Sequence, residues 1–197
     1  MLGGKLMDNE VRLFKIILAG DGEVGKTSLR KRYMGHGFDK EYIRTMGADF
    51  AVHETIIGNE TIRWQIWDIA GQPEYSQMIK TYYKRCIGAI VVYDITRRTT
   101  FEHADMWINE IWKHNGEFPV IPLVLVGNKM DLRSYRKNTL TEEEGTQLAT
   151  ELSAITEEKG FSIPYVETSA LTGEGVHQTF QELRELIIGF IDREIIE

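Results

Sequence analysis

Short apolar runs alternate along this chain with longer stretches in which apolar residues recur at helical spacing. Short runs bounded by turn-forming residues are typical of buried β-strands, and the longer periodic stretches are typical of helices that cover a sheet. The segments that we interpret as strands are residues 13–19, 49–57, 61–69, 89–95, 123–127 and 164–167. The segments that we interpret as helices are residues 28–33, 99–115, 141–159 and 176–191.

The order of these segments predicts an α/β fold, a doubly wound, mostly parallel six-stranded sheet with helices on both faces. Gly58-Asn59 joins two of the strands and favours a tight turn, so we expect one antiparallel strand at an edge of the sheet. A chain of 197 residues is long enough for one well-buried core. We therefore expect a single domain over residues 11–192, after an extension over residues 1–10 and before a tail over residues 193–197.

Two local patterns predict details of the helices. Thr141 and Glu144 have the spacing of a capping box, which predicts that Thr141 caps the helix that follows it. The aromatic residues of the 99–115 segment, Phe101, Trp107 and Trp112, fall at helical spacing, and we interpret them as core.

Charge and cysteine content narrow the classes of function. The formal net charge is -7 and no basic run appears, which argues against a general nucleic-acid binder. Cys86 is the single cysteine, so we expect a reducing, cytoplasmic setting and a core position for this residue. No apolar run reaches the ~20 residues that span a bilayer, and the ends as given carry neither a signal peptide nor a lipidation motif. We expect a monomer with no encoded lipid anchor, which would reach a membrane only through a partner.

Residues 20–27 match the phosphate-binding pattern GxxxxGK[ST] and lie between a predicted strand and a predicted helix. Backbone N–H groups and the positive end of that helix would face the phosphates, and Lys26 would reach the terminal ones, which gives it a catalytic role. Thr27 is an expected Mg²⁺ ligand. This segment narrows the predicted α/β fold to that of a P-loop NTPase. Taken alone, the segment could also be a glycine-rich turn with a solvated lysine. The nucleotide-binding residues that we expect here are Gly20, Asp21, Gly22, Glu23, Val24, Gly25, Lys26, Thr27 and Ser28.

A carboxylate at a strand end is followed by a glycine and an amide in the segment 68–72, Asp-Ile-Ala-Gly-Gln. In P-loop proteins such an aspartate holds Mg²⁺, which assigns Asp68 to the metal. Gly71 would offer a backbone N–H to the γ-phosphate. Gln72 can accept and donate hydrogen bonds at once, so it could orient an attacking water as a catalytic residue. A strand that leads into a polar turn is the alternative interpretation.

Asn128, Lys129 and Asp131 follow another buried run, at the strand end where ligands bind in open α/β sheets. Asp131 can accept two hydrogen bonds from an edge with adjacent N–H and NH₂ donors, which guanine has and adenine lacks. The Lys129 stem can lie along the purine face. The pattern predicts guanine selectivity, although an Asn/Asp turn that starts a helix would explain this tetrapeptide alone.

Together with Glu-Thr-Ser-Ala at residues 167–170, these segments resemble the Ras superfamily of small GTPases over residues 13–191. The chain is most similar to the Rab subfamily, through YIRTMGADF at residues 42–50, WDIAGQ at residues 67–72 and GAIVVYDIT at residues 88–96. The resemblance implies a molecular switch in signalling or trafficking that binds GTP and GDP with Mg²⁺ and hydrolyses GTP slowly.

The resemblance also implies roles for individual residues. Thr45 matches the switch threonine that senses Mg²⁺ and the γ-phosphate. Phe38 matches an aromatic that packs on guanine, and Tyr42 one that closes over the phosphates. Ser169 and Ala170 match the loop whose backbone N–H reads the guanine oxygen, and Leu171 stands where a lysine is usual. Effectors, GTPase-activating proteins and exchange proteins would contact the segments around Thr45 and Gln72.

Two positions depart from the family pattern. Pro73 follows Gln72 and could misplace it, or could simply start the next helix rigidly. Glu23 brings a negative charge close to the phosphates. These departures motivate an alternative function, a GTP-binding interaction module with very weak or no hydrolysis. A P-loop ATPase or small-molecule kinase is a third hypothesis, against which Asp131 speaks. No arginine is expected as a built-in catalytic finger.

Overall fold

The computed structural model describes residues 11–37, 45–57, 60–116 and 119–194. The strands are β1 (Val11–Ala19), β2 (Ala48–Ile57), β3 (Glu60–Ile69), β4 (Gly88–Asp94), β5 (Leu123–Asn128) and β6 (Tyr165–Thr168). The helices are α1 (Lys26–Tyr33), α2 (Ser76–Ile79), α3 (Arg98–Glu102), α4 (Ala104–Asn115), α5 (Glu142–Thr156) and α6 (Val176–Glu194). Single 3₁₀ turns are η1 (Pro73–Tyr75), η2 (Met130–Leu132) and η3 (Glu157–Lys159).

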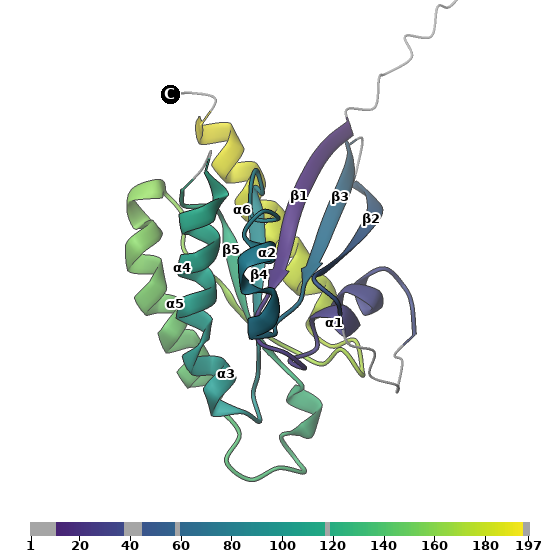
Figure 1. Cartoon of the computed structure of the whole chain (residues 1–197), viewed down its shortest axis with the longest axis vertical. Helices are drawn as coiled ribbons and strands as arrows, with labels where there is room; N and C mark the ends of the chain where they lie inside the picture. Colours follow the sequence, from purple (N-terminus) through teal and green to yellow (C-terminus); the bar gives the residue numbers. More distant parts are fainter. Residues whose placement is uncertain (1–10, 38–44, 58–59, 117–118, 195–197) are drawn as a thin grey trace, which may run out of the picture.

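The strands form one six-stranded sheet in the order β2-β3-β1-β4-β5-β6. Strands β1, β3, β4, β5 and β6 pair in parallel, whereas β2 runs antiparallel to β3 at one edge. Figure 1 shows helices on both faces of this sheet. The predicted fold class is confirmed, including the antiparallel edge strand.

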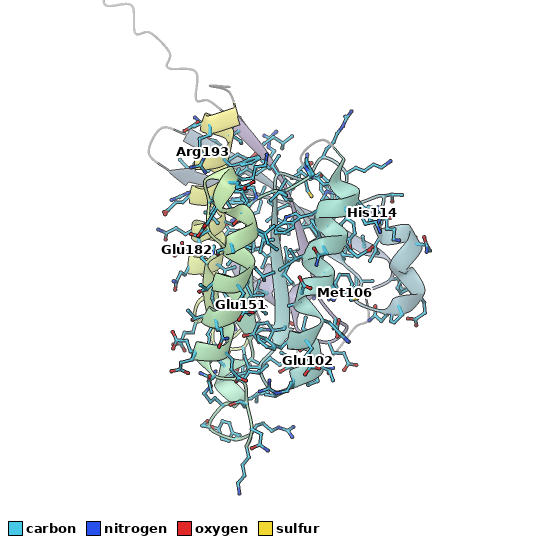
Figure 2. All side chains as sticks on the ribbon, turned by 90° about the vertical axis from the view of Figure 1, so that its left-hand side faces the viewer. Glu102, Met106, His114, Glu151, Glu182 and Arg193 are labelled. Carbon is cyan, nitrogen blue, oxygen red and sulfur yellow. The ribbon has the colours of Figure 1, made fainter. Side chains whose placement is uncertain are left out.

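Each face of the sheet has its own apolar core. Along β1, Ile17 packs into the core beneath α4 and α5, and its neighbour Ile16 packs into the core beneath α1 and α6. This alternation follows from the two-residue period of a strand and explains why β1 reads as a continuous apolar run. Figure 2 looks onto α4 and α5, where Met106 and Glu151 lie on the outer surface. The sheet is therefore covered by helices on both faces.

The helices differ from the expected bounds in four places. α6 ends at Glu194 rather than at residue 191. α1 begins at Lys26, so the helix starts within the last two residues of the phosphate-binding segment rather than at residue 28. The predicted helix over residues 99–115 is divided at His103, between α3 and α4. The predicted helix over residues 141–159 ends at Thr156 and continues as the turn η3, which closes at the left-handed Gly160.

Both local helix predictions are confirmed. The Thr141 hydroxyl accepts a bond from the Glu144 N–H, and the Glu144 carboxylate accepts one from the Thr141 N–H, which is the reciprocal capping box. Trp107 and Trp112 are buried in the core, and Phe101 packs against it. Among the helices in the described ranges, none combines the length and the apolar character needed to cross a membrane.

Candidate functional site

The carboxyl ends of β1, β3 and β5 meet at one edge of the sheet, because parallel neighbours all end on the same side. A cavity of about 660 Å³ lies there. The residues expected from the sequence that line it are Gly22, Glu23, Gly25, Lys26, Thr27, Ser28, Thr45, Gly71, Gln72, Asn128, Lys129, Asp131, Ala170 and Leu171. Segments from distant parts of the chain therefore converge on a single cavity.

The phosphate-binding segment wraps around the Lys26 side chain. Lys26 is only 6% exposed, and its ammonium donates to the carbonyls of Gly20 and Asp21, each at 2.7 Å. Burial lowers the pKa of Lys26 to about 8, against the opposing charges of Asp68 and Asp21. Gly25 has φ 103, where a side chain would be strained and would also collide with Asn128. The first turn of α1 carries no acidic residue, so its N–H groups are available to an anion.

Glu23 takes an unusual backbone conformation in this segment. Its φ of 67 lies in the left-handed region, which glycine adopts far more readily than glutamate. The side chain is 63% exposed and its carboxylate lies 3.8 Å from the Arg97 guanidinium. The negative charge therefore lies at the rim of the cavity and faces a cation.

Gly71 and Gln72 reach the cavity from the end of β3. A Cβ on Gly71 would lie 2.2 to 2.4 Å from backbone atoms of residues 20–22, so only glycine permits this close approach. A Cβ on Gly22 would lie 3.4 Å from Gln72 Nε2. Pro73 is the first residue of η1, in agreement with the interpretation that it starts the next helical turn.

The oxygen-bearing side chains of Thr27, Thr45 and Asp68 lie together near the start of α1. The Thr27 hydroxyl donates to Asp68 Oδ2 at 2.5 Å, and Thr45 Oγ1 lies 3.1 Å from Thr27 Oγ1. Asp68 is fully buried, and its other carboxylate oxygen finds no hydrogen-bond partner among the residues that the structure describes. Burial raises the pKa of Asp68, against the lowering effects of the Thr27 bond and the Lys26 charge. Two threonine hydroxyls beside a buried carboxylate that has an unsatisfied oxygen fit a hard cation such as Mg²⁺.

Asp131, Asn128 and Ala170, which are expected from the sequence to recognise the base, also lie at the cavity. The Ser169 hydroxyl donates to Asp131 Oδ1 at 2.6 Å, which fixes the orientation of that carboxylate. Asn128 Oδ1 accepts bonds from the Thr168 hydroxyl at 3.0 Å and from the Ala170 N–H at 3.2 Å. A guanine oxygen would therefore have to share the Ala170 donor with Asn128.

Some expected site residues lie behind the cavity or outside the described part of the chain. Gly20 and Asp21 contribute carbonyls to Lys26, and Val24 is buried in the core. The Asp21 carboxylate turns away toward α4, where it accepts from the Trp107 indole N–H and lies 2.8 Å from His103 Nδ1. The expected contacts of Phe38 and Tyr42 lie outside the described residues.

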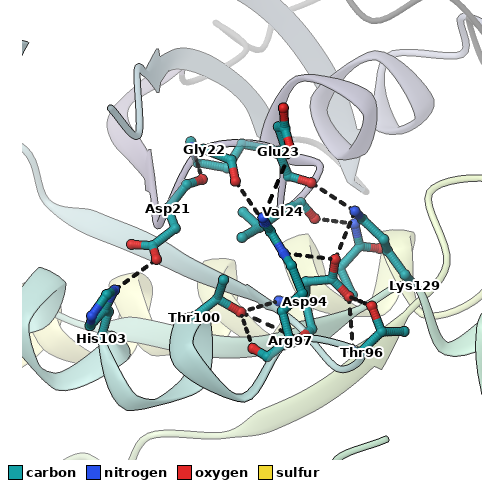
Figure 3. Close-up of polar contacts among 12 residues, drawn as sticks. Asp21, Gly22, Glu23, Val24, Asp94, Thr96, Arg97, Thr100, His103 and Lys129 are labelled. Atoms are coloured by element: carbon teal, nitrogen blue, oxygen red, sulfur yellow. Dashed lines mark hydrogen bonds and ion pairs between the residues drawn. The ribbon is translucent and has the colours of Figure 1, made fainter. Parts of the chain in front are cut away.

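Sequence reasoning missed two groups that hold the site loops. Arg97 donates to the Gly22 carbonyl at 2.7 Å and pairs with the buried Asp94 at 3.3 Å (Figure 3). Arg32 on α1 donates to the carbonyls of Ala170 and Leu171. One signal was available for Asp94, because it ends β4 as Asn128 ends β5, at the strand ends where ligands bind.

Comparison with known proteins agrees with this geometry. The family model described as the Ras family matches residues 15–188. The chain is 38% identical to "Ras-related protein Rab11E" of Lotus japonicus, over the full chain and 84% of that protein. It is 35% identical to "Ras-related protein RABA1b" of Arabidopsis thaliana, over the full chain and 85% of that protein. It is 36% identical to "Ras-related protein YPTC6" of Chlamydomonas reinhardtii, over 94% of the chain and 80% of that protein. The chain therefore belongs to the Ras family, and it is a Rab-like small GTPase that hydrolyses GTP and acts as a nucleotide-dependent switch.

Proposed function

We propose that the cavity at the strand ends binds the guanine nucleotide with its base toward Asp131 and its phosphates along residues 22–27. The observation that supports this most is the convergence of the phosphate-binding segment, Gln72 and Asp131 on one cavity. Asp131, held by Ser169, can accept from the two adjacent donors of guanine. Adenine lacks this pair of donors, so the Asp131 carboxylate would lose both hydrogen bonds at a large cost.

In this proposal Thr27, Thr45 and Asp68 hold Mg²⁺, with Asp68 acting directly or through a water. The unsatisfied oxygen of Asp68 supports the assignment. Bound Mg²⁺ would neutralise charge that develops on the phosphates. The protonated Lys26 ammonium would stabilise charge on the same phosphates.

Gln72 is the proposed catalytic residue for hydrolysis. It would orient a water in line with the terminal phosphate while the Gly71 N–H holds that phosphate. The absence of a side chain on Gly22 leaves space next to Gln72, and Pro73 places the residues after it in a turn. Arg97, which contacts the phosphate-binding segment, is bound to the Gly22 carbonyl and Asp94 and is not expected to act as a built-in catalytic finger, so the intrinsic rate should be slow.

The segments around Thr45 and Gln72 are the proposed mobile parts that report the bound nucleotide. Thr45 reaches the metal site, and Met78 of α2 approaches Gly47, so the two segments contact each other. Exposed apolar side chains lie beside them, among them Met46 and Phe50. Effectors, GTPase-activating proteins and exchange proteins would bind the monomer on this surface.

A competition experiment tests the proposed base recognition. Protein stripped of nucleotide with EDTA is loaded with fluorescent GDP and Mg²⁺, and unlabelled GDP, GTP and ATP compete for the site. GDP and GTP should displace the probe, and ATP should not. Asp131→Ala should weaken GDP binding by about 100-fold or more, because two hydrogen bonds to a charged group are lost.

The matched control is Asp105→Ala, which removes an exposed carboxylate on α4 that bonds Asn109. It should bind GDP as the unaltered protein does. Displacement by ATP as effective as that by GTP, or equal GDP binding by the two variants, would overturn the assignment of Asp131.

A further inference from the structure

Three consecutive carbonyls of the phosphate-binding segment are each held by a side chain from another part of the chain. The Gly22 carbonyl accepts from Arg97 at 2.7 Å, the Glu23 carbonyl from Lys129 at 2.7 Å and the Val24 carbonyl from Asn128 at 2.8 Å. Figure 3 shows Arg97 and Lys129 side by side beneath the loop. Asn128 ends β5 and Lys129 follows it, whereas Arg97 lies in the loop after β4, directly before α3.

These bonds fix which way the loop N–H groups point. In a trans peptide the carbonyl and the following N–H lie in one plane and point in opposite directions, and the described residues contain no cis bond. Holding the Gly22 carbonyl on the outside therefore turns the Glu23 N–H toward the cavity. Arg97 thus acts on the backbone group that an anion would meet.

A single buried carboxylate orients both cationic donors. Asp94 is 3% exposed and lies 2.8 Å from Lys129 Nζ and 3.3 Å from Arg97 Nε. It also accepts bonds from the N–H and hydroxyl of Thr96 at 2.9 and 2.7 Å. Arg97, which is 37% exposed, is therefore held in place from behind while it contacts the loop.

Arg97 also faces the charge of Glu23. The Glu23 carboxylate would repel the phosphates of a bound nucleotide, and the guanidinium 3.8 Å away offsets this repulsion. Gly22 lies next to Gln72, which in the proposed orientation faces the terminal phosphate, so both effects would act on the phosphates rather than on the base.

We propose that Arg97 is a positioning residue that slows nucleotide release by holding the Gly22–Glu23 peptide against the phosphates and by offsetting the Glu23 charge. The inference rests on the proposed nucleotide orientation. It assigns to Arg97 an effect on how long GDP stays bound. The effect of Arg97 would act only on the phosphates beyond the first.

The test is the rate at which fluorescent GDP leaves the Mg²⁺-loaded protein when excess GDP is added. Arg97→Ala should release GDP about tenfold faster, the effect of losing one charge-assisted hydrogen bond. Arg97→Gln, which keeps an amide donor but not the charge, should be about threefold faster. Glu23→Gln in the Arg97→Ala background should slow release again.

The affinity for GMP should stay within about twofold in all variants, because GMP lacks the phosphates on which Arg97 acts.

Arg98→Ala is the matched control, because the neighbouring Arg98 pairs with Glu144 away from the loop. It should release GDP at the original rate. The inference is overturned if Arg97→Ala and Arg98→Ala release GDP equally fast, or if Arg97→Ala weakens GMP and GDP binding equally, as general destabilisation would. An unaltered protein that binds no GDP with Mg²⁺ would instead contradict the proposed function itself.

Discussion

Burial sets the chemistry of individual side chains in this molecule. Lys26 and Asp68 are both enclosed at the site, and burial acts against the charged form of each. Their mutual attraction offsets part of that cost. A bound phosphate and a cation would relieve the rest, so we expect the site to favour its charged ligands strongly.

Cys86 shows the same effect without a ligand. It is fully buried, its thiol donates to the Tyr83 carbonyl at 2.9 Å, and burial raises its pKa from 9.0 to about 12. The core position expected for this residue is confirmed. A shift of this size leaves about 10³-fold less thiolate near pH 8 than in the unfolded chain, and the thiolate is the reactive form.

We therefore predict that iodoacetamide at pH 8 alkylates Cys86 about 10³-fold more slowly in the native protein than in denaturant, as followed by mass spectrometry. Because folding raises the pKa of this acid, its contribution to stability is complete below pH 9 and is lost as the pH rises toward 12. Urea unfolding should show this loss, and Cys86→Ala should reduce it. Equal alkylation of native and unfolded protein would refute the prediction.

The sequence identified site residues where the chemistry needs a side chain in a fixed pattern. Thr27, Gln72 and Asp131 belong to such motifs, and all three line the cavity. The sequence did not reveal Arg97, because its contact is a bond to a backbone carbonyl, which many side chains at many positions can make. The contact depends on the path of the loop after β4, which no periodicity records.

At the scale of elements, the cap of α5 is the most direct link from sequence to stability. Thr141 and Glu144 satisfy each other's N–H groups at the start of the helix. Thr141→Ala should lower the free energy of unfolding by about 1 kcal/mol and the melting temperature by roughly 2–4 °C, as measured by calorimetry.

Thr146→Ala, in an exposed position within the same helix, provides the control. It should change the melting temperature little, since alanine is a good helix former. Equal losses for the two variants would show that the cap contributes nothing beyond a threonine side chain.

Element types were predictable from the sequence, and some boundaries were not. The spacing of Trp107 and Trp112 correctly predicts a buried helical face, but it continues without interruption across His103, where the helix divides. At that point His103 and Trp107 both contact Asp21 of the phosphate-binding segment. A tertiary contact of this kind leaves no mark on local periodicity.

At the scale of the whole molecule, the topology assembles the site. Because β1, β3, β4 and β5 are neighbours that end at the same edge, segments about 100 residues apart, such as Val24 and Asn128, come within bonding distance. The family pattern and the parallel sheet together made this convergence predictable. The proposed switch depends on it, because one cavity joins the base, the metal and Gln72.

Single-turnover hydrolysis of GTP by the Mg²⁺-loaded protein tests the central claim most directly. We predict complete conversion to GDP at a rate far below the ~1–100 s⁻¹ typical of kinases. Gln72→Leu should slow it about tenfold or more, whereas Gln147→Leu, which changes an exposed glutamine on α5, should not. Hydrolysis that is absent from the unaltered protein, or that is untouched by Gln72→Leu, would contradict the account.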